Sequence, residues 1–447
     1  MKRVFLETYG CQMNVADSEL MAGVLERAGM TLTDRPEDAD AIVLNTCAIR
    51  EHAEQRVLGR LGDFARLKRR RPELVVGVAG CMAQHLRKRL LEDQSRVLDL
   101  VVGPDGYRTL PELLRRAAGE PVSHVRLDRD ETYGDLEPKR GEGIRAWVTV
   151  QRGCDKFCTY CVVPYTRGRE RSLTLEELMR QVREAVTRGF REIVFLGQTV
   201  NSYHDGTHDF ADLLRATNDV EGVRRIRYTS PHPSDVTPRM IDVIATCAKV
   251  CPQVHLPLQS ASDAVLKAMN RTYDMARYRE IVAALRSSIP EVALSTDIIV
   301  GFPGETEADF ERTLEYLKEV RFDSAFLFKY SARPDTRAFL WPETVPEADK
   351  GRRLQRLIDL QLSISAQRND AWLGREVEVL VEGPARRGDS QLYGRSPQFK
   401  AVVFPDDGAR PGDLRRVRVV GTTSNTLIAA PAQSPAAPPA TALLSIG

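Results

Sequence analysis

The sequence lacks the features of a membrane or exported protein. Its 447 residues contain no run of about 18 apolar residues, the length that an apolar helix needs to cross a bilayer. The opening stretch MKRVFLETYG leads directly into a strand-like segment and contains no apolar signal region. These absences predict a cytoplasmic protein with no membrane partner.

The sequence also has little net charge, with a formal value of only +2. Nucleic-acid binding therefore cannot be inferred from the overall charge and would need local basic patches. The hydrophobic content of 42% and the charged content of 28% are ordinary for a globular protein. The length suggests about three domains.

Cysteine is scarce, because eight cysteines in so long a chain are too few for a disulfide scaffold. Three of them nevertheless lie within the stretch QRGCDKFCTYC, as Cys154, Cys158 and Cys161. A closed zinc site needs four ligands and a cubane iron-sulfur cluster has four irons, so three thiolates would leave one iron open to a small molecule. A zinc knuckle or a chance grouping of reduced cysteines is the alternative interpretation.

Three further cysteines lie at equivalent places in the first part of the chain. Over residues 1–120, short β-rich apolar runs alternate with helical patterns, which predicts a parallel α/β sheet. Cys11 and Cys81 follow the first and third predicted strands, and Cys47 ends the second. Because the carboxyl ends of parallel strands share one edge, we predict a second three-thiolate site there. The alternative is three unrelated buried cysteines.

The rest of the chain divides into a linker, two domains and a tail. Residues 121–143 include a polar segment with Gly and Pro and are predicted to form a linker. Six strand candidates within residues 144–370 predict a partial (β/α)6 TIM-like barrel, with its site at the carboxyl ends of the strands. Residues 371–430 are predicted to form a small β-barrel. The Pro/Ala-rich tail, residues 431–447, is predicted to be disordered.

The two cysteine sets are accompanied by motifs of a known family. The CxxxCxxC spacing resembles the signature of the radical S-adenosylmethionine (SAM) superfamily, and residues 1–430 resemble the radical SAM methylthiotransferases. Within that family, the sequence is similar to the branch that modifies transfer RNA. The stretches that carry this resemblance are YGCQMN (9–14), NTCAIRE (45–51), GCMAQ (80–84), CVVPYTRGRERS (161–172) and TSPHP (229–233).

The resemblance implies an N-terminal cluster-binding domain, a radical SAM core and a C-terminal TRAM domain. It implies two [4Fe-4S] clusters, one held by Cys11, Cys47 and Cys81 and the other by Cys154, Cys158 and Cys161, with no catalytic residue expected beyond these ligands. The implied reaction transfers a methylthio group to carbon 2 of N6-isopentenyladenosine, just 3' of the anticodon. One SAM would donate the methyl group and a second would supply the radical. We also expect a reducing electron donor as a partner, and a monomer.

The resemblance also suggests three SAM-binding segments. Tyr160 stands where the superfamily commonly has an aromatic residue beside the cofactor adenine, and ordinary packing is its alternative role. Gly197 and Gln198 end a strand where a Gly-Glu pair often binds the SAM amino group, but here Gln198 replaces the Glu. In DIIVGFPGE (297–305), Ile299 is expected to touch adenine, although Glu305 falls one position late. A strand-to-helix turn followed by a capping box, Thr306 to Asp309, equally explains this segment.

Several other features have two interpretations. Cys247 and Cys251 lie four residues apart, which could mimic a metal pair, but core packing is favoured because no third ligand is near in sequence. The segment ARLKRRRPE (65–73) could contact phosphate or could simply complement a helix C-terminus. Further candidates for contact with RNA are Arg167, Arg169 and Arg171 after the cluster motif, and Arg386, Arg387, Arg395 and Lys400 in the small barrel.

Two other functions compete with the tRNA-modifying one. A sister methylthiotransferase that modifies an aspartate of a ribosomal protein shares the cluster chemistry, but the CQMN and NTCAIRE stretches argue against it. A non-catalytic iron-sulfur protein that binds RNA or carries electrons is a rival of another class. Such a carrier needs neither an open iron nor a SAM-binding barrel.

Overall fold

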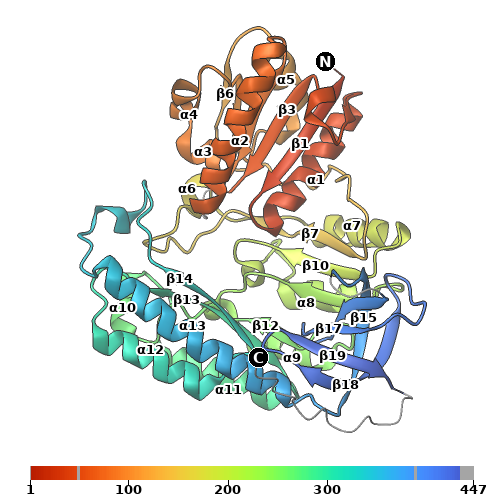
Figure 1. Ribbon diagram of the computed structural model, residues 1–447, viewed down its shortest axis with the longest axis vertical. Coiled ribbons are helices and arrows are strands. Elements are labelled where there is room, and N and C mark those ends of the chain that lie inside the picture. The colour runs from red at the N-terminus through yellow and green to blue at the C-terminus, as the bar shows by residue number, and fades with distance from the viewer. Residues whose placement is uncertain (1, 48–50, 387–389, 433–447) are drawn as a thin grey trace, which may run out of the picture.

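The computed structural model describes residues 2–47, 51–386 and 390–432, which form three bodies (Figure 1). The N-terminal sheet domain lies at one end, the open central barrel lies below it, and the small C-terminal barrel lies against the central one. This is the α/β architecture predicted from the sequence. Within the described ranges, no helix combines the length and the apolar character needed to cross a membrane. Arg387 and most of the predicted disordered tail, residues 433–447, lie outside the described residues.

The N-terminal domain is built on one parallel sheet, with the strand order β2-β1-β3-β4-β5-β6. Every residue of β3 and β4 is buried, because α1 and α5 cover one face and α2, α3 and α4 cover the other. The elements are β1 (Arg3–Tyr9), α1 (Gln12–Arg27), β2 (Thr31–Leu32), β3 (Ala41–Thr46), α2 (Glu51–Arg70), β4 (Val75–Gly80), α3 (Cys81–Leu86), α4 (Lys88–Asp93), β5 (Leu100–Val102), α5 (Leu110–Ala117) and β6 (Val122–His124).

The linker prediction for residues 121–143 needs correction. Strand β6 lies inside that range and pairs with β5, so the sheet continues past residue 120. The segment that follows is packed rather than loose, because Tyr133 and Leu136 are buried in the core of the N-terminal domain. Tyr133 stacks on Tyr107, with ring centroids 5.9 Å apart. The polar composition of this segment concealed the few apolar residues that fix it.

The central domain contains the six predicted strands in two parallel sheets, ordered β11-β10-β7 and β12-β13-β14. A parallel bridge between Ile226 and Val250 joins the sheets, so β7 and β14 are the outer edges of a partial barrel. The main elements are β7 (Arg145–Thr149), β8 (Gln151–Arg152), α6 (Val163–Arg167), β9 (Arg171–Ser172), α7 (Leu175–Thr187), β10 (Glu192–Leu196), α8 (Phe210–Asn218), β11 (Arg225–Tyr228), α9 (Pro238–Thr246), β12 (Gln253–His255), α10 (Asp263–Ala268), α11 (Met275–Ser288), β13 (Ala293–Val300), α12 (Glu307–Val320), β14 (Ser324–Lys329) and α13 (Glu347–Asp370).

Alternation along these strands separates the helix-covered core from the barrel interior. In β10, Ile193 and Phe195 enter the large core beneath the helices, whereas Glu192 lies on the other face with two arginines. In β14, Leu327 packs against the same core while Phe326 and Phe328 are about half exposed, at 58% and 47%. The barrel interior therefore has a charged cluster around Glu192 on one side and an aromatic wall, Phe326 and Phe328, on the other.

The C-terminal domain is a closed five-stranded barrel in the order β15-β16-β17-β19-β18. The chain turns between β16 and β17 at Phe399, which has a φ of 66°. Apolar residues from all five strands fill the interior. The strands are β15 (Glu376–Pro384), β16 (Gln391–Arg395), β17 (Ala401–Pro405), β18 (Leu414–Thr422) and β19 (Thr426–Pro431).

Buried arginines of the central barrel fix the C-terminal barrel in place. Arg227 donates to the carbonyl oxygens of Ser396 (2.8 Å) and Pro397 (2.9 Å), and Arg225 binds Glu378 (3.1 Å). Lys400 was predicted to contact RNA, but it is only 8% exposed and pairs with Asp323 at 2.8 Å. That prediction was wrong, because this lysine is part of the contact between the two domains.

Candidate active site

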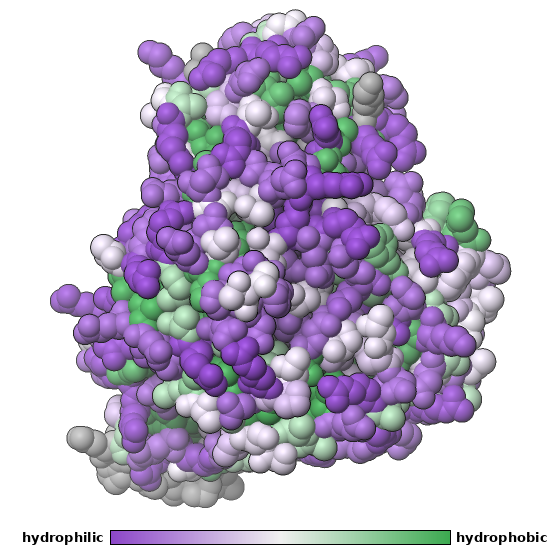
Figure 2. Space-filling view, turned by 180° about the vertical axis from the view of Figure 1, so that it is seen from behind, coloured by the Kyte–Doolittle hydropathy of each residue, from purple (hydrophilic) through white to green (hydrophobic). Residues whose placement is uncertain are grey.

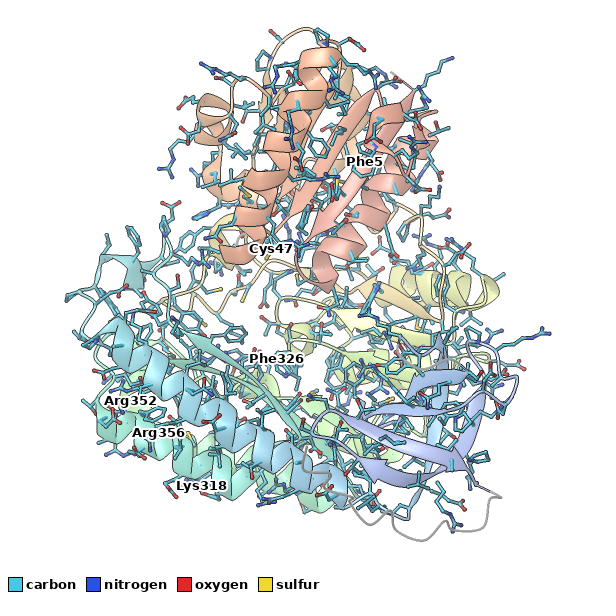
Figure 3. The ribbon with its side chains drawn as sticks, viewed as in Figure 1. Phe5, Cys47, Lys318, Phe326, Arg352 and Arg356 are labelled. Atoms are coloured by element: carbon cyan, nitrogen blue, oxygen red, sulfur yellow. The ribbon has the colours of Figure 1, made fainter. Side chains whose placement is uncertain are left out.

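The first cysteine set lies at one edge of the N-terminal sheet, as the alternation of strands and helices predicted. Cys11 caps α1 after β1, Cys47 directly follows β3, and Cys81 begins α3 after β4. Gly10 has a φ of 139°, and a Cβ there would lie only 2.7 Å from the Cβ of Cys47. Glycine therefore lets the chain segments that carry these cysteines approach each other. Figure 3 shows Cys47 at the end of the sheet that faces the central domain.

The asparagines of the CQMN and NTC motifs brace this edge. Asn45 donates to the carbonyl oxygen of Asn14 at 2.7 Å and to Ser18 Oγ at 2.8 Å. The side-chain oxygen of Asn14 accepts from the Cys11 thiol at 3.3 Å. Both asparagines are fully buried, so these hydrogen bonds satisfy polar groups that would otherwise destabilise the fold. The motifs thus fix the backbone on which the cysteines stand.

The thiols of the first set have different pKa values. A hydrogen bond with Cys47 is the main cause that lowers the pKa of Cys11 to about 6; burial opposes this change and the charge of Arg167 assists it. Burial raises the pKa of Cys81, although Arg167 Nε donates to its sulfur at 3.1 Å. A thiol with a lowered pKa is a ready thiolate ligand.

The second set lies in the loop between β8 and α6, near the carboxyl end of β7. Cys154 Sγ is 3.2 Å from Thr199 Oγ1, and Cys158 Sγ accepts from Arg271 Nη1 at 3.3 Å. Burial, together with the nearby Cys158, raises the pKa of Cys161 to about 12. Each cysteine set therefore has an arginine that donates to a sulfur: Arg167, which is buried, in the first set and Arg271, which is partly buried, in the second. No local pattern in the sequence identifies Thr199 or Arg271 as such a neighbour.

The spacing of the cysteines is compatible with iron-sulfur clusters. Over the described parts of the chain, no three Cys, His, Asp or Glu side chains lie close enough to share a single metal ion. In a [4Fe-4S] cluster each cysteine binds a different iron, so the ligands stand farther apart than those of one zinc ion. None of the eight cysteines, all of which lie within the described residues, forms a disulfide. The donor chemistry of both sets fits a cluster.

The predicted SAM-binding residues lie around the second cysteine set. Tyr160 and Ile299 pack against the same apolar cluster, in which Phe302 lies edge-on to Tyr160 with centroids 6.2 Å apart. Gly197 forms a tight turn, where a Cβ would lie 3.0 Å from the Val200 backbone. Gln198 directly precedes Thr199, the neighbour of Cys154. The four predicted residues thus belong to segments on both sides of the second cysteine set.

Unpaired polar atoms at the carboxyl ends of the strands fit a polar cofactor. Among the described residues, Gln198 Oε1, Gln259 Oε1 and His232 Nε2 are buried and have no hydrogen-bond partner. Burial lowers the pKa of His232 to about 2, so its ring is neutral, and its other ring nitrogen contacts Ser234 Oγ at 2.7 Å. A bound molecule with amino, carboxylate and hydroxyl groups, as SAM has, would satisfy such atoms. His232 lies in the TSPHP motif but was not predicted as a contact.

Glu305 has a structural role. It accepts from the backbone of Gly301 at 2.6 Å and pairs with Arg353 at 2.7 Å. The predicted capping box also forms, because Thr306 and Asp309 cap α12 reciprocally. A strand-to-helix turn followed by a capping box therefore explains the second half of DIIVGFPGE.

Two of the three arginines after the cluster motif cannot contact RNA. Arg167 pairs with Asp17 at 2.6 Å and Arg171 with Asp105 at 3.0 Å, and both arginines are buried. Only Arg169 is largely exposed, with 66% of its side chain accessible beside Asp155. In the 65–73 segment, Lys68 pairs with Asp99, whereas Arg66, Arg69 and Arg70 are exposed. Cys247 and Cys251 are buried, as expected for core packing.

Comparison with known proteins identifies the family. Residues 148–317 match the Radical SAM superfamily, residues 3–103 the Uncharacterized protein family UPF0004, and residues 371–431 the TRAM domain. Similar to the chain are the tRNA-2-methylthio-N(6)-dimethylallyladenosine synthases of Chloroherpeton thalassium, 46% identical over 95% of each chain, and of Moorella thermoacetica, 46% identical over 92% of this chain and 94% of that one. The chain belongs to this family of synthases. The radical SAM, cluster-domain and TRAM predictions are thereby confirmed.

Solved structures support the same architecture. The radical S-adenosylmethionine methyltransferase TsrM from Kitasatospora setae, solved with cobalamin and a [4Fe-4S] cluster bound, aligns with a TM-score of 0.58. It is 14% identical, and the alignment covers 76% of this chain and 74% of TsrM. At this identity the likeness concerns the fold alone.

Proposed function

We propose that this protein transfers a methylthio group to carbon 2 of N6-isopentenyladenosine, just 3' of the anticodon in tRNA. The observation that carries the proposal is the meeting of two cysteine sets at one domain boundary. Cys81 of the first set packs against Val162, the residue after Cys161 of the second. Family membership supports the choice of tRNA, since the relatives are named as synthases of the methylthiolated nucleoside.

The two cysteine sets and the segments around the second set are proposed to hold the cofactors. Cys11, Cys47 and Cys81 would bind one [4Fe-4S] cluster, and Cys154, Cys158 and Cys161 the other. Tyr160, Gly197, Gln198 and Ile299 would contact SAM. When bound, the second cluster supplies the electron that cleaves SAM to a 5'-deoxyadenosyl radical, and the reaction consumes another SAM as methyl donor.

The chain's own side chains would position these groups. Arg167 and Arg271 each donate a hydrogen bond to a cysteine sulfur, one in each set. Thr199 holds Cys154 beside the end of β10. Hydrogen bonds to ligands of this kind orient the ligands and tune the metal centre. The buried, neutral His232 would offer a ring nitrogen to cofactor or substrate without bringing a positive charge.

The interior of the barrel offers an apolar surface for the prenylated base. Phe328 lies opposite Ile299 in the strand pairing, and Phe326 lies opposite Asp297. The Phe326 ring also meets His255 of β12, with centroids 5.9 Å apart, so Phe326 lies over the interior face of the sheet. In Figure 3 it lies away from the outer helix surface that bears Arg352 and Arg356. We propose that the isopentenyl group contacts Phe326 and Phe328.

The C-terminal barrel would add affinity for the RNA through its exposed arginines. Arg386, Arg410 and Arg416 are exposed. The face shown in Figure 2 is mostly hydrophilic, with hydrophobic residues in small separate patches.

We propose a cytoplasmic monomer that receives electrons from a low-potential reductant.

The proposed function can be tested by offering the enzyme a prenylated RNA and, in parallel, a peptide. Reconstituted enzyme, SAM, a strong reductant and inorganic sulfide as the sulfur donor should methylthiolate a prenylated anticodon stem-loop, and mass spectrometry of the digested RNA should show the modified nucleoside. The same mark should disappear from tRNA of a strain that lacks the protein. An enzyme that cleaves SAM but modifies only a peptide would reject the tRNA assignment, and one that never cleaves SAM would favour an electron carrier.

A further inference from the structure

Arg167 joins the two cysteine sets across the boundary between the N-terminal and central domains. It ends α6 of the central domain, and its side chain is 4% exposed. Its Nε donates to Cys81 Sγ at 3.1 Å, and its Nη2 donates to Asp17 Oδ2 at 2.6 Å. Both acceptors belong to the N-terminal domain. One guanidinium therefore contacts a proposed cluster ligand and a domain-anchoring carboxylate together.

Asp17 is held from three directions. Besides Arg167, it accepts from Arg152 Nη2 at 2.8 Å and from the Tyr107 hydroxyl at 3.4 Å. Arg152 lies two residues before Cys154. Asp17 is therefore bonded to residues on both sides of the second cysteine set in sequence, Arg152 before it and Arg167 of α6 after it. The carboxylate is fully buried, and such a charge is tolerated only when it is paired. These hydrogen bonds to Asp17 fix the position of the Arg167 guanidinium group.

We propose that Arg167 is a positioning residue that tunes the N-terminal cluster from the central domain. The proposal rests on the ligand assignment in the proposed function. The Nε–H of Arg167 would donate to the Cys81 thiolate and partly neutralise the charge of that sulfur. A hydrogen bond and a positive charge beside a ligand sulfur stabilise the reduced, more negative cluster, and therefore raise its reduction potential. Among the described residues, Arg167 Nη1 is also buried without a partner, so a donor remains for a group taken up at this edge.

Only an arginine can make both contacts. The planar guanidinium presents several N–H donors in fixed directions, whereas a lysine ammonium is a point charge on a flexible stem. A lysine at position 167 would retain a positive charge for Asp17 but would lose the simultaneous bond to Cys81. The Arg167→Lys variant therefore separates the charge pair from the sulfur contact.

The neighbouring pair Arg171 and Asp105 offers a matched control. It crosses the same domain boundary, with hydrogen bonds of 3.0 and 3.1 Å, and its side chains are 7% and 1% exposed. Within the described parts of the chain, Arg171 donates to Asp105 and to backbone oxygens rather than to a cysteine. Because Arg171 Nη2 also donates to the carbonyl oxygen of Arg167 at 3.0 Å, the control changes the other partner. Asp105→Asn removes the buried ion pair across the boundary but leaves Arg171 in place and does not touch a cluster ligand.

The test uses the full-length chain with Cys154, Cys158 and Cys161 replaced by Ala, reconstituted so that only the N-terminal cluster is present. Electron paramagnetic resonance during a redox titration gives its spectrum and midpoint potential. We expect R167Q and R167K to lower the potential and change the spectrum, whereas D105N leaves both unchanged. Because R167K keeps the charge facing Asp17, it tests the sulfur contact even if R167Q does not fold.

Two results would overturn the proposal: an unchanged potential in both Arg167 variants, or an equal shift in D105N. A triple-alanine chain that binds no cluster would overturn the ligand assignment and this proposal together. If the shift is found but the wild-type enzyme makes no methylthiolated nucleoside, the proposed function alone fails. The two hypotheses are therefore distinguishable.

Discussion

Asp17 accepts hydrogen bonds from two arginines of the neighbouring domain while its own side chain is completely buried. Burial alone would raise the pKa of Asp17, but the charges of Arg167 and Arg152 outweigh it and lower that pKa. A carboxyl group with a lowered folded-state pKa stabilises the fold above its unfolded pKa of about 4. Its contribution is lost as the pH falls through the lower folded value.

The first prediction is that Asp17→Asn destabilises the metal-free protein by about 3–5 kcal/mol at neutral pH, because two buried arginines lose their counter-charge. The difference from wild type should begin to shrink as the pH falls below about 4, where Asp17 of the unfolded wild-type chain becomes protonated, and should be lost as the pH falls through the lower folded pKa. Urea unfolding at several pH values measures both effects. The control, Asp242→Asn, removes an ion pair whose Asp side chain is 62% exposed, and should cost at most about 1 kcal/mol. A constant difference at every pH would contradict the prediction.

The second prediction concerns the cysteines. Replacing Cys154, Cys158 and Cys161 with Ala should leave about four irons per chain and abolish SAM cleavage. Replacing Cys11, Cys47 and Cys81 should also leave about four irons, but reductive SAM cleavage should persist while the methylthio product disappears. Iron and sulfide analysis after anaerobic purification, with product analysis, checks this division. Zinc in place of iron would refute it.

The arginines illustrate what the sequence could not predict at the level of the residue. RGRERS places three arginines at alternate positions, yet Arg167 and Arg171 are buried while Arg169 is exposed. The difference depends on Asp17 and Asp105, which lie 150 and 66 positions away from the arginines that they pair with. The residues next to an arginine in the sequence do not indicate which distant aspartate it pairs with. The places of the six cysteines in the fold were predictable, because Cys154, Cys158 and Cys161 share one short stretch and Cys11, Cys47 and Cys81 stand at the ends of recognisable strands.

At the level of the element, most strands of the three parallel sheets were predictable from continuous or alternating apolar runs. Strand β6 was missed because VSH is short and only Val122 is buried. The two-residue strands β8 and β9 frame the second cysteine loop, but pairs so short have no periodicity to detect. Strand β14 was predicted, but the exposure of its aromatic residues follows from its place at the open edge of the barrel.

The third prediction tests this aromatic wall. In Phe326→Ala/Phe328→Ala, the preference for a prenylated over an unprenylated anticodon stem-loop should fall by roughly tenfold, because the prenyl group no longer has an apolar surface to bind. The ratio of the two Kd values at one salt concentration measures it. Leu362→Ala, which removes a 47% exposed apolar side chain on α13, should leave the ratio unchanged. An unaltered ratio in the double variant would exclude the wall as the prenyl-binding surface.

At the scale of the whole molecule, the C-terminal barrel is more firmly integrated than its separate β-rich sequence suggested. Arg145, Arg225 and Arg227 of the central barrel reach Glu382, Glu378 and the Ser396 carbonyl oxygen, respectively. Truncation before Ala371 would expose these arginines and remove the partners that offset their burial. A loss of RNA binding in a truncated chain would therefore not distinguish an RNA anchor from a structural support.

The fourth prediction uses surface variants that leave this docking intact. Arg386, Arg410 and Arg416 are exposed on the C-terminal barrel, and phosphate binding by arginine releases counterions. If all three bind tRNA phosphates, replacing them with Gln should reduce the slope of log affinity against log salt by roughly 0.7 to 0.9 for each arginine replaced. The melting temperature and SAM cleavage without RNA should not change.

Arg352 and Arg356 on the outer helix surface supply the control for this experiment (Figure 3). They are already paired with Glu307 and Glu311 at 3.1 and 2.6 Å, so their replacement by Gln should leave the slope unchanged. Binding of labelled tRNA over a series of salt concentrations gives both slopes. An equal slope in wild type and the triple Gln variant would show that Arg386, Arg410 and Arg416 do not bind phosphate.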